Sequence, residues 1–306
     1  MAWLRAAARA KINLTLDIVA RRPDGYHDIE SVMHTIGLAD EVCVRMSEGP
    51  LVSLRVMGAK LPEDPRNLAW KAADATLRAI MGKSAAGNGV EVELVKNIPF
   101  EAGLAGGSSD AAVVIHLVNE VFGRPLVVSE LAAVASGIGA DVPFLLTGGA
   151  VFAEGIGDRL TVLDCFMDRP VVIAKPTTGL STSLMYRAWD EKHEAGRAQS
   201  IGKDTSSRAF LSELAGKGPD GAIKHVHNDF EDLAAIAVPE ISEFKAIMLG
   251  AGAVACAMSG SGTAVFGIFD GEDDARRAME ALRNGHGDIF TACTRLDPRR
   301  HIPMLE

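Results

Sequence analysis

Closely spaced cysteines are missing from this sequence. Its 306 residues include four cysteines, which are widely separated and form no Cys-x-x-Cys pair. Without such a pair no zinc site is indicated, and cysteines this scattered do not suggest a disulfide framework. We interpret the thiols as reduced and partly buried, as expected for a cytoplasmic protein.

Positive charge is scarce as well. The 31 Lys and Arg residues face 40 Asp and Glu residues, which gives a formal net charge of -9. The overall field therefore does not favour nucleic acid or an anionic membrane surface, and we expect neither as a partner. A phosphate ligand would have to be held by local positive charge and by backbone N–H groups.

Long apolar runs are also lacking. The N-terminal stretch is rich in alanine, but Arg5, Arg9 and Lys11 interrupt it, so we expect no signal peptide. No run reaches the roughly 20 apolar residues of a membrane-spanning helix. The composition, 48% hydrophobic and 23% charged, is typical of a globular protein, and the length favours two domains.

Residues 10–18 alternate between apolar and polar side chains and predict a β-strand. Lys11 and Asn13 belong to the polar set. Because residues two apart on a strand share one face, we expect these two side chains to lie close together. Taken alone, Lys11 is also typical of a solvated strand position.

The strongest local signal is a strand, a loop of small residues and a helix. Residues 90–94 alternate as a strand, residues 102–109 read Ala-Gly-Leu-Ala-Gly-Gly-Ser-Ser, and an apolar helix is predicted from Asp110 to about Phe122. Small residues let backbone N–H groups approach an oxyanion, and a helix N-terminus favours negative charge. The same residues could form a tight structural turn with a serine N-cap. Phosphate binding is the interpretation that we favour.

Three other patterns lack the context that their function needs. Gly82-Lys83-Ser84 resembles the end of a Walker A loop, but Leu77 occupies the position of the required glycine. Gly250-Ala251-Gly252 resembles a dinucleotide fingerprint, but a helix-like segment precedes it. His225 and His227 have no evident third metal ligand.

The rest of the chain can be divided by composition. A helix is predicted over 67–81 with Asn67 as its N-cap. We place a domain boundary near residue 155, which gives domains 1–155 and 156–306. Residues 190–222 are polar and rich in Lys, Glu, Ser and Gly, and we expect a mobile surface segment there.

Together these motifs resemble those of the GHMP kinases. The family's N-terminal strand with its lysine resembles residues 10–14, its Pro-x-x-x-Gly-Leu-x-Gly-Gly-Ser-Ser motif resembles residues 99–110, and its late glycine/serine loop resembles residues 259–262. Their order and spacing cover nearly the whole chain. The resemblance implies a two-domain α+β fold, with an N-terminal ATP-binding domain like domain 2 of ribosomal protein S5 and a ferredoxin-like C-terminal substrate domain.

Further segments resemble the members of this family that act on a cytidine diphosphate derivative of methylerythritol. These segments are residues 22–27, residues 139–144, and Ser181-Thr182 with Tyr186. The implied reaction transfers a phosphoryl group from ATP, with Mg²⁺, to the 2-hydroxyl of that small molecule in the non-mevalonate isoprenoid pathway. We expect a monomer or a weak homodimer.

The resemblance also implies roles for individual residues. Lys11 and Asp141 would be catalytic, Asp141 taking or orienting the proton of the accepting hydroxyl and Lys11 stabilising charge. The residues implied to contact the acceptor are Asn13, Tyr26, His27, Asp141, Thr182 and Tyr186, with the two tyrosines sandwiching the cytosine ring and His27 bonding its edge. The residues implied to bind ATP are Asn67, Lys96, Pro99, Ala102, Gly103, Leu104, Ala105, Gly106, Gly107, Ser108 and Ser109, with Ser109 as a candidate magnesium ligand.

Two residues of the phosphate loop depart from the family pattern. Glu101 stands where the loop usually has a small residue, and an acid beside ATP phosphates is unfavourable unless it points away or meets magnesium. Ala105 replaces a common glycine. Both departures leave the detailed path of the loop open.

Two alternative functions are carried forward. The first is a GHMP kinase for another small alcohol, such as homoserine or mevalonate; Tyr26, His27 and Tyr186 argue against it, because those alcohols offer no flat base to stack on. The second is a catalytically silent relative that binds nucleotide. Retention of both Lys11 and Asp141 argues against that. By itself, however, Asp141 also suits a helix N-cap two residues before a proline.

Overall fold

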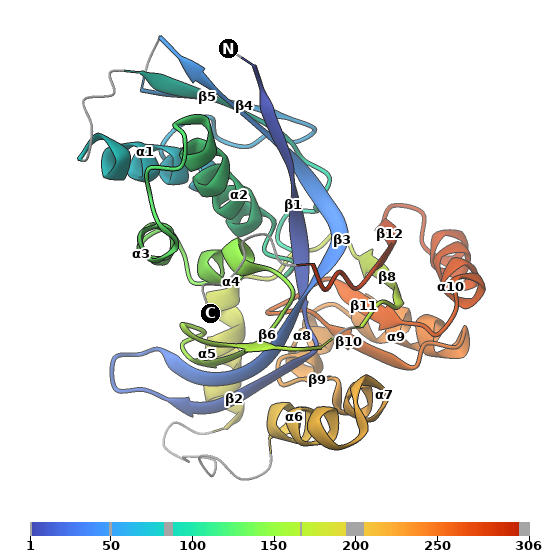
Figure 1. The fold of residues 1–306 in the computed structure, drawn as a ribbon. Helices are drawn as coiled ribbons and strands as arrows, with labels where there is room; N and C mark the ends of the chain where they lie inside the picture. Colours follow the sequence, from blue (N-terminus) through green and yellow to red (C-terminus); the bar gives the residue numbers. More distant parts are fainter. Residues whose placement is uncertain (1, 49–50, 83–87, 166, 194–204, 300–306) are drawn as a thin grey trace.

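The computed structural model describes residues 2–48, 51–82, 88–165, 167–193 and 205–299. They form two α+β halves that pack against each other, with α1 and α2 on one side of the long strands β1 and β3 and the C-terminal sheet on the other (Figure 1). The N-terminal elements are β1 (Leu4–Asn13), β2 (Thr15–Arg21), β3 (His27–Ser47), β4 (Val52–Met57), α1 (Leu68–Met81), β5 (Gly89–Val95), α2 (Gly106–Val121), α3 (Val128–Ser136), α4 (Val142–Thr147), β6 (Ala150–Gly155) and β7 (Arg159–Leu163).

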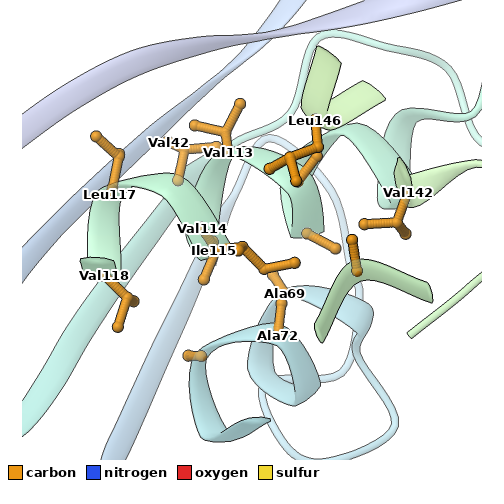
Figure 2. Close-up of a cluster of buried hydrophobic side chains, with 14 of the residues drawn as sticks. Val42, Ala69, Ala72, Val113, Val114, Ile115, Leu117, Val118, Val142 and Leu146 are labelled. Atoms are coloured by element: carbon orange, nitrogen blue, oxygen red, sulfur yellow. The ribbon is translucent and has the colours of Figure 1, made fainter. Parts of the chain in front are cut away.

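Strand β3 organises the N-terminal sheet. It pairs antiparallel with β1, β2, β5 and β6, while β4 adds to β5 in parallel and β7 adds to β6 antiparallel. Helices α1 and α2 cover one face and bury a cluster that includes Val42, Ala72, Val114 and Val118 (Figure 2). The alanines of α1 allow the two helices to approach closely, so α2 is held rigidly with its N-terminus at the edge of the sheet.

The C-terminal elements are β8 (Pro170–Lys175), α5 (Thr182–Lys192), α6 (Ser206–Lys217), α7 (Pro219–Ala222), η1 (Ile223–His225), β9 (His227–Asn228), α8 (Glu231–Ala237), α9 (Glu240–Gly250), β10 (Ala255–Met258), β11 (Val265–Ile268), α10 (Glu272–Gly285) and β12 (Phe290–Arg295). Strands β8, β10, β11 and β12 form an antiparallel sheet in the order β10-β11-β8-β12. This β-α-β-β-α-β connectivity is ferredoxin-like, as predicted.

The two sheets bury an apolar cluster between them. Ile12 and Ile36 from the N-terminal sheet share this cluster with Val171, Ile173 and Phe266 from the C-terminal sheet. Burial of these side chains removes apolar surface of both domains from water, which holds the domains together. Among the described residues, no helix is both long and apolar enough to cross a bilayer.

Helix α2 begins earlier than predicted. It starts at Gly106 rather than Asp110, because the N–H of Ser109 already bonds the carbonyl of Ala105 at 2.9 Å. Gly106, Gly107 and both serines of the motif therefore form the first helical turn. The predicted helix over 67–81 is confirmed, and Asn67 caps it by accepting the N–H of Ala69 at 2.9 Å.

The prediction of a mobile segment over 190–222 is wrong for the part that the structure describes, while residues 194–204 lie outside the described residues. Helix α5 continues to Lys192, and α6 follows with its N-cap at Thr205. Helix α6 packs because Phe210, which is fully buried, joins the cluster between the sheets. The polar composition of this stretch gave no sign that Phe210 would be buried.

The predicted domain boundary at residue 155 falls inside a β-hairpin. Strand β7 pairs with β6 from Ala150↔Leu163 to Glu154↔Arg159 and so extends the N-terminal sheet. We propose placing the boundary after Leu163, because strand pairing is continuous up to that residue.

Candidate active site

A cleft of about 1590 Å³ lies where the two domains meet. It is lined by the turn before β3, the loop before α2, the N-termini of α4 and α5, and the glycine loop 260–262. Every residue predicted to contact ATP or the acceptor lines this cleft, with the exception of Ser109. The structure therefore brings together segments that are far apart in the sequence.

The loop that leads into α2 has an unusual backbone. Glu101, Gly103 and Ala105 all have positive φ angles, of 49°, 73° and 55°. Ala105 is left-handed at the N-cap position, which explains why glycine is common there, since a non-glycine residue in this conformation costs about 1–2 kcal/mol. Among the described residues no side chain caps α2, so the first N–H groups of this helix are available to an anion at the cleft.

A second glycine loop holds this phosphate loop in place from the other domain. The Ser259 hydroxyl donates to the carbonyl of Gly103 at 2.9 Å, and the N–H of Ala264 donates to the carbonyl of Ala102 at 3.1 Å. A Cβ atom on Gly103 would lie 1.9 Å from the Ser259 carbonyl oxygen. Only glycine permits this close approach of the two loops.

Ser109 and Glu101 of the phosphate loop each have defined side-chain contacts. Ser109 is buried against β1 and donates its hydroxyl to the carbonyl of Arg9 at 2.6 Å. This placement argues against Ser109 as a magnesium ligand and leaves Ser108 as the serine that faces the cleft. The Glu101 side chain packs against Gly179 and lies near Lys175, so it turns away from the start of α2.

Lys96, predicted to contact ATP, forms a buried ionic cluster beside this loop. Its ammonium bonds the carboxylates of Asp40 and Asp110. Asp40 also accepts the N–H group of Ile98 at 2.8 Å. Burial raises the pKa of Asp110 to about 7, against the opposing effect of Lys96, and its Oδ1 has no hydrogen-bond partner among the described residues. Nothing in the local sequence indicates that Asp40 and Asp110 bind Lys96.

Lys11 and Asn13 do share one face of β1, as predicted. The Lys11 ammonium donates to Asn13 Oδ1 at 2.6 Å, and Asn13 Nδ2 donates to Ser31 Oγ at 2.8 Å. Burial lowers the pKa of Lys11, and the negative charge of Asp141 partly opposes that effect. Lys11 is therefore a buried amine whose carboxylate neighbour is Asp141. The prediction of a solvated Lys11 is wrong, because only 4% of the residue is exposed.

Asp141 occupies the N-cap position of α4, with Pro143 in the first turn. Its side chain makes no capping hydrogen bond there. The carboxylate is consequently free of the role that its sequence context suggested, and it lines the cleft together with Lys11.

At the other end of the cleft, aromatic side chains gather around His27. Tyr26 is 62% exposed, which suits a residue at the rim. Tyr186 stacks on His27 with ring centroids 4.6 Å apart and a 20° interplanar angle. Burial, with a smaller effect of Asp141, raises the pKa of Tyr186 to about 12, so its hydroxyl stays protonated. Thr182 shares a 2.8 Å hydrogen bond with Ser261 of the second glycine loop.

The Walker A-like and dinucleotide-like patterns of the sequence can be placed only in part. Lys83 and Ser84 lie outside the described residues, and Gly252 follows a helix, as expected. Elsewhere, one ligand atom each of Asp17, His227 and Asp229 lie within 4.8 Å of one another. Asp17 and Asp229 already accept backbone N–H groups, so this group serves to hold the chain together.

Comparison with known proteins places these features in one family. The family model "GHMP kinases N terminal domain" matches residues 67–149, and "GHMP kinases C terminal" matches residues 211–288. The chain belongs to the GHMP kinase family. The matched segments contain α2 with its open N-terminus and the second glycine loop, and both line the cleft of this kinase.

Two curated relatives with the same name match nearly the whole chain of this GHMP kinase. The 4-diphosphocytidyl-2-C-methyl-D-erythritol kinase of Geobacter sulfurreducens is 38% identical over 283 residues, covering 92% of this chain and 96% of that protein. The kinase of the same name from Geobacter metallireducens is 38% identical over 295 residues, covering 96% and 99%.

Solved structures agree on the fold. A crystal structure of 4-(cytidine 5'-diphospho)-2C-methyl-D-erythritol kinase matches with a TM-score of 0.74 and 35% identity, covering 95% of this chain and 99% of the other. Homoserine kinase from Cytophaga hutchinsonii matches with a TM-score of 0.73 at 18% identity, covering 97% and 95%. At that identity the second likeness shows the shared fold alone.

Proposed function

We propose that this protein transfers the terminal phosphoryl group of ATP to the 2-hydroxyl of 4-diphosphocytidyl-2-C-methyl-D-erythritol. The observation that carries the proposal is the shared cleft, which is lined by Lys11 and Asp141, by the uncapped N-terminus of α2 and by the aromatic side chains around His27. The shared name of the relatives, which match nearly the whole chain, supports this acceptor.

The ATP end of the cleft supplies mainly backbone groups. The N–H groups of Gly106, Gly107 and Ser108 would bind the phosphates at the start of α2. This arrangement explains how a chain of net charge -9 can hold a polyanion, because the binding charge is local.

The reacting groups lie between the two ends. The proton of the accepting hydroxyl would pass to Asp141 as the alcohol oxygen bonds phosphorus and ADP leaves. Lys11, held by Asn13, would stabilise the charge on the transferring group. Phosphoryl transfer needs little covalent help from a protein, so positioning and electrostatic stabilisation account for most of the rate.

Mg²⁺ fits this cleft through oxygen donors. Ser108 and the carboxylates of Asp110 and Asp141 line it, and Oδ1 of Asp110 lacks a partner among the described residues. Oxygen ligands of this kind, together with nucleotide phosphates, are what Mg²⁺ prefers. When bound, the ion would neutralise charge on the ATP phosphates.

The acceptor end supplies side chains. Tyr26 and Tyr186 would stack on the cytosine ring, His27 would bond its edge, and Asn13 and Thr182 would contact the rest of the acceptor. Stacking of the base on an aromatic ring would contribute about 1–3 kcal/mol to the binding free energy of the acceptor.

The test is direct phosphorylation by the purified protein. With ATP, Mg²⁺ and the cytidine acceptor, we expect ADP release matched by a new phosphate monoester in the ³¹P NMR spectrum. Homoserine and mevalonate serve as competing acceptors, and they should give no product above the rate without acceptor. Product from either alcohol but not from the cytidine compound would overturn the proposal, and binding of ATP without turnover on any acceptor would indicate a silent relative.

A further inference from the structure

Three side chains of one helix hold the imidazole of His27. Tyr186 stacks on its face, Trp189 meets it edge-on with centroids 5.7 Å apart, and Asp190 lies 2.7 Å from its Nε2. These residues are spaced i, i+3 and i+4 on α5, so they share one helix face. His27 itself starts β3 in the other domain, and only 6% of it is exposed.

Asp190 is shared between two partners. Its Oδ1 faces His27, and its Oδ2 lies 3.4 Å from Arg21. Arg21 and His27 are cross-strand neighbours in the β2–β3 pairing, which brings both to the same carboxylate. The guanidinium donates hydrogen bonds and never accepts them, so it holds Asp190 in the role of an acceptor.

This arrangement decides which nitrogen of His27 carries the proton. A carboxylate only accepts hydrogen bonds, so Nε2 must donate to Asp190. In the neutral imidazole a proton on Nε2 leaves Nδ1 as an acceptor. Among the described residues, Nδ1 of His27 has no hydrogen-bond partner. It is absent from the unpaired side-chain atoms that are fully buried, so part of its surface is accessible. It belongs to a residue that lines the cleft, so it is open to a ligand.

We propose that Asp190 determines the base specificity of the acceptor site by fixing the tautomer of His27. The inference rests on the proposed function, since it assumes that a pyrimidine base enters this end of the cleft. The amino group at position 4 of cytosine donates a hydrogen bond, whereas the oxygen at position 4 of uracil only accepts one. An unprotonated Nδ1 therefore pairs with cytosine and opposes uracil. Asp190 is a positioning residue that acts through His27 rather than on the substrate.

Asp190→Asn is the sharpest variant because it can reverse the tautomer. Arg21 would take the amide oxygen, since a guanidinium can only donate, and the amide NH₂ would then face His27. An NH₂ donor at Nε2 requires that nitrogen to accept, which moves the imidazole proton to Nδ1. Glu191→Gln is the matched control: it removes the same charge from the next residue of α5, which is exposed and does not line the cleft.

The first measurement needs no substrate. Nitrogen-15 NMR of the histidine side chains, with the His27 signals assigned through their loss in His27→Gln, reports which ring nitrogen is protonated. We expect the proton on Nε2 in the wild type and in Glu191→Gln, and on Nδ1 in Asp190→Asn. A wild-type protein with a proton on Nδ1, either alone or together with one on Nε2, would overturn the inference, whether or not the variant folds.

The second measurement is the ratio of kcat/KM for the cytidine acceptor to that for its uridine counterpart. Asp190→Asn should lower this ratio by about 5- to 150-fold, the scale set by leaving a buried polar group mispaired, with the KM for ATP unchanged. Glu191→Gln should keep the wild-type ratio. A wild type that does not phosphorylate the cytidine compound would overturn the proposed function. A wild type that does so, alongside an Asp190→Asn variant that keeps its selectivity, would overturn this inference alone.

Discussion

The two ends of the cleft recognise their ligands by different means. At the ATP end, the open N-terminus of α2 and two interlocked glycine loops present mainly backbone groups. At the acceptor end, the contacts come from side chains on β3 and α5, which belong to different domains. Backbone recognition needs small residues in an unbroken stretch, whereas side-chain recognition needs elements that the fold brings together. Substitutions should therefore act differently at the two ends.

The largest effect is expected between the two ends. Asp141→Ala and Lys11→Ala should each lower kcat by roughly two to four orders of magnitude, the range of general acid–base contributions. Steady-state kinetics would measure this, and the KM values for ATP and acceptor should change much less than kcat. A folded variant with near-normal kcat would show that the altered residue is not catalytic.

Replacing Lys11 should affect stability differently from activity. Burial lowers the pKa of Lys11, so the folded state disfavours the charged form. The free energy of unfolding should therefore rise as pH increases from the lowered pKa toward the usual value of 10.5. Lys11→Met should then leave the free energy of unfolding unchanged or higher at neutral pH while activity is lost. Urea unfolding measures this. A clear loss of stability would show that the ammonium stabilises the fold.

At the ATP end, binding should be lost when an added side chain blocks access to the backbone N–H groups. A Cβ at Gly107 would lie 3.8 Å from a Leu68 methyl group, an ordinary contact, whereas one at Gly106 would lie 3.0 Å from Ile98. Gly107→Val should thus fold normally yet weaken ATP binding by roughly 10- to 1000-fold, the scale of losing one or two hydrogen bonds to a charged group. Calorimetric titration with ATP measures it, with circular dichroism as the check on folding. Native affinity would mean that this turn does not bind phosphate.

At the acceptor end, removal of a single side chain should weaken binding of the acceptor. Tyr26→Ala and Tyr186→Ala should raise the KM for the cytidine acceptor by about 5- to 150-fold, as expected for loss of one stacking contact, with the KM for ATP little changed. Tyr186→Ala should have the larger effect, because Tyr186 also packs on His27. Normal acceptor binding in both variants would contradict the sandwich and favour a small alcohol without a base.

The smallest effect concerns pH. Burial raises the pKa of Asp110 to about 7, from the usual value of 3.8. Between these values the folded state keeps a proton that the unfolded state has lost, so the free energy of unfolding falls as pH rises. From pH 5 to pH 8 the wild type should lose about 2 kcal/mol relative to Asp110→Asn, which cannot titrate there. Parallel stability curves for the two proteins would show that Asp110 has no such shift.

Much of the ATP end was predicted from local sequence. The loop 102–109 and the cap at Asn67 depend on neighbours in the chain, and only the start of α2 was displaced, by four residues. The errors came from contacts with distant elements. Ser109 turns toward Arg9 of β1 instead of the cleft, and residues 205–222 are helical because Phe210 is buried between the sheets.

Asp190, Asp40 and Asp110, which the sequence did not reveal as site residues, also depend on contacts with distant elements. Asp190 could have been suspected, because it stands one helical turn after Tyr186, but nothing local connects it to His27, 163 positions away. Asp40 and Asp110 meet Lys96 only when β3, β5 and α2 come together.

By itself, the sequence determined the phosphate loop, the strand that pairs Lys11 with Asn13, and the family to which the chain belongs. Each of these depends on residues within a few positions of one another, where backbone conformation and side-chain period already limit the geometry. Tertiary structure alone decided that Asp141 leaves its helix uncapped and reaches the neighbourhood of Lys11, and that α5 clamps His27. These contacts join segments more than a hundred residues apart. Folding of the N-terminal domain brings Asp141 near Lys11, and the packing of the two domains brings α5 to His27.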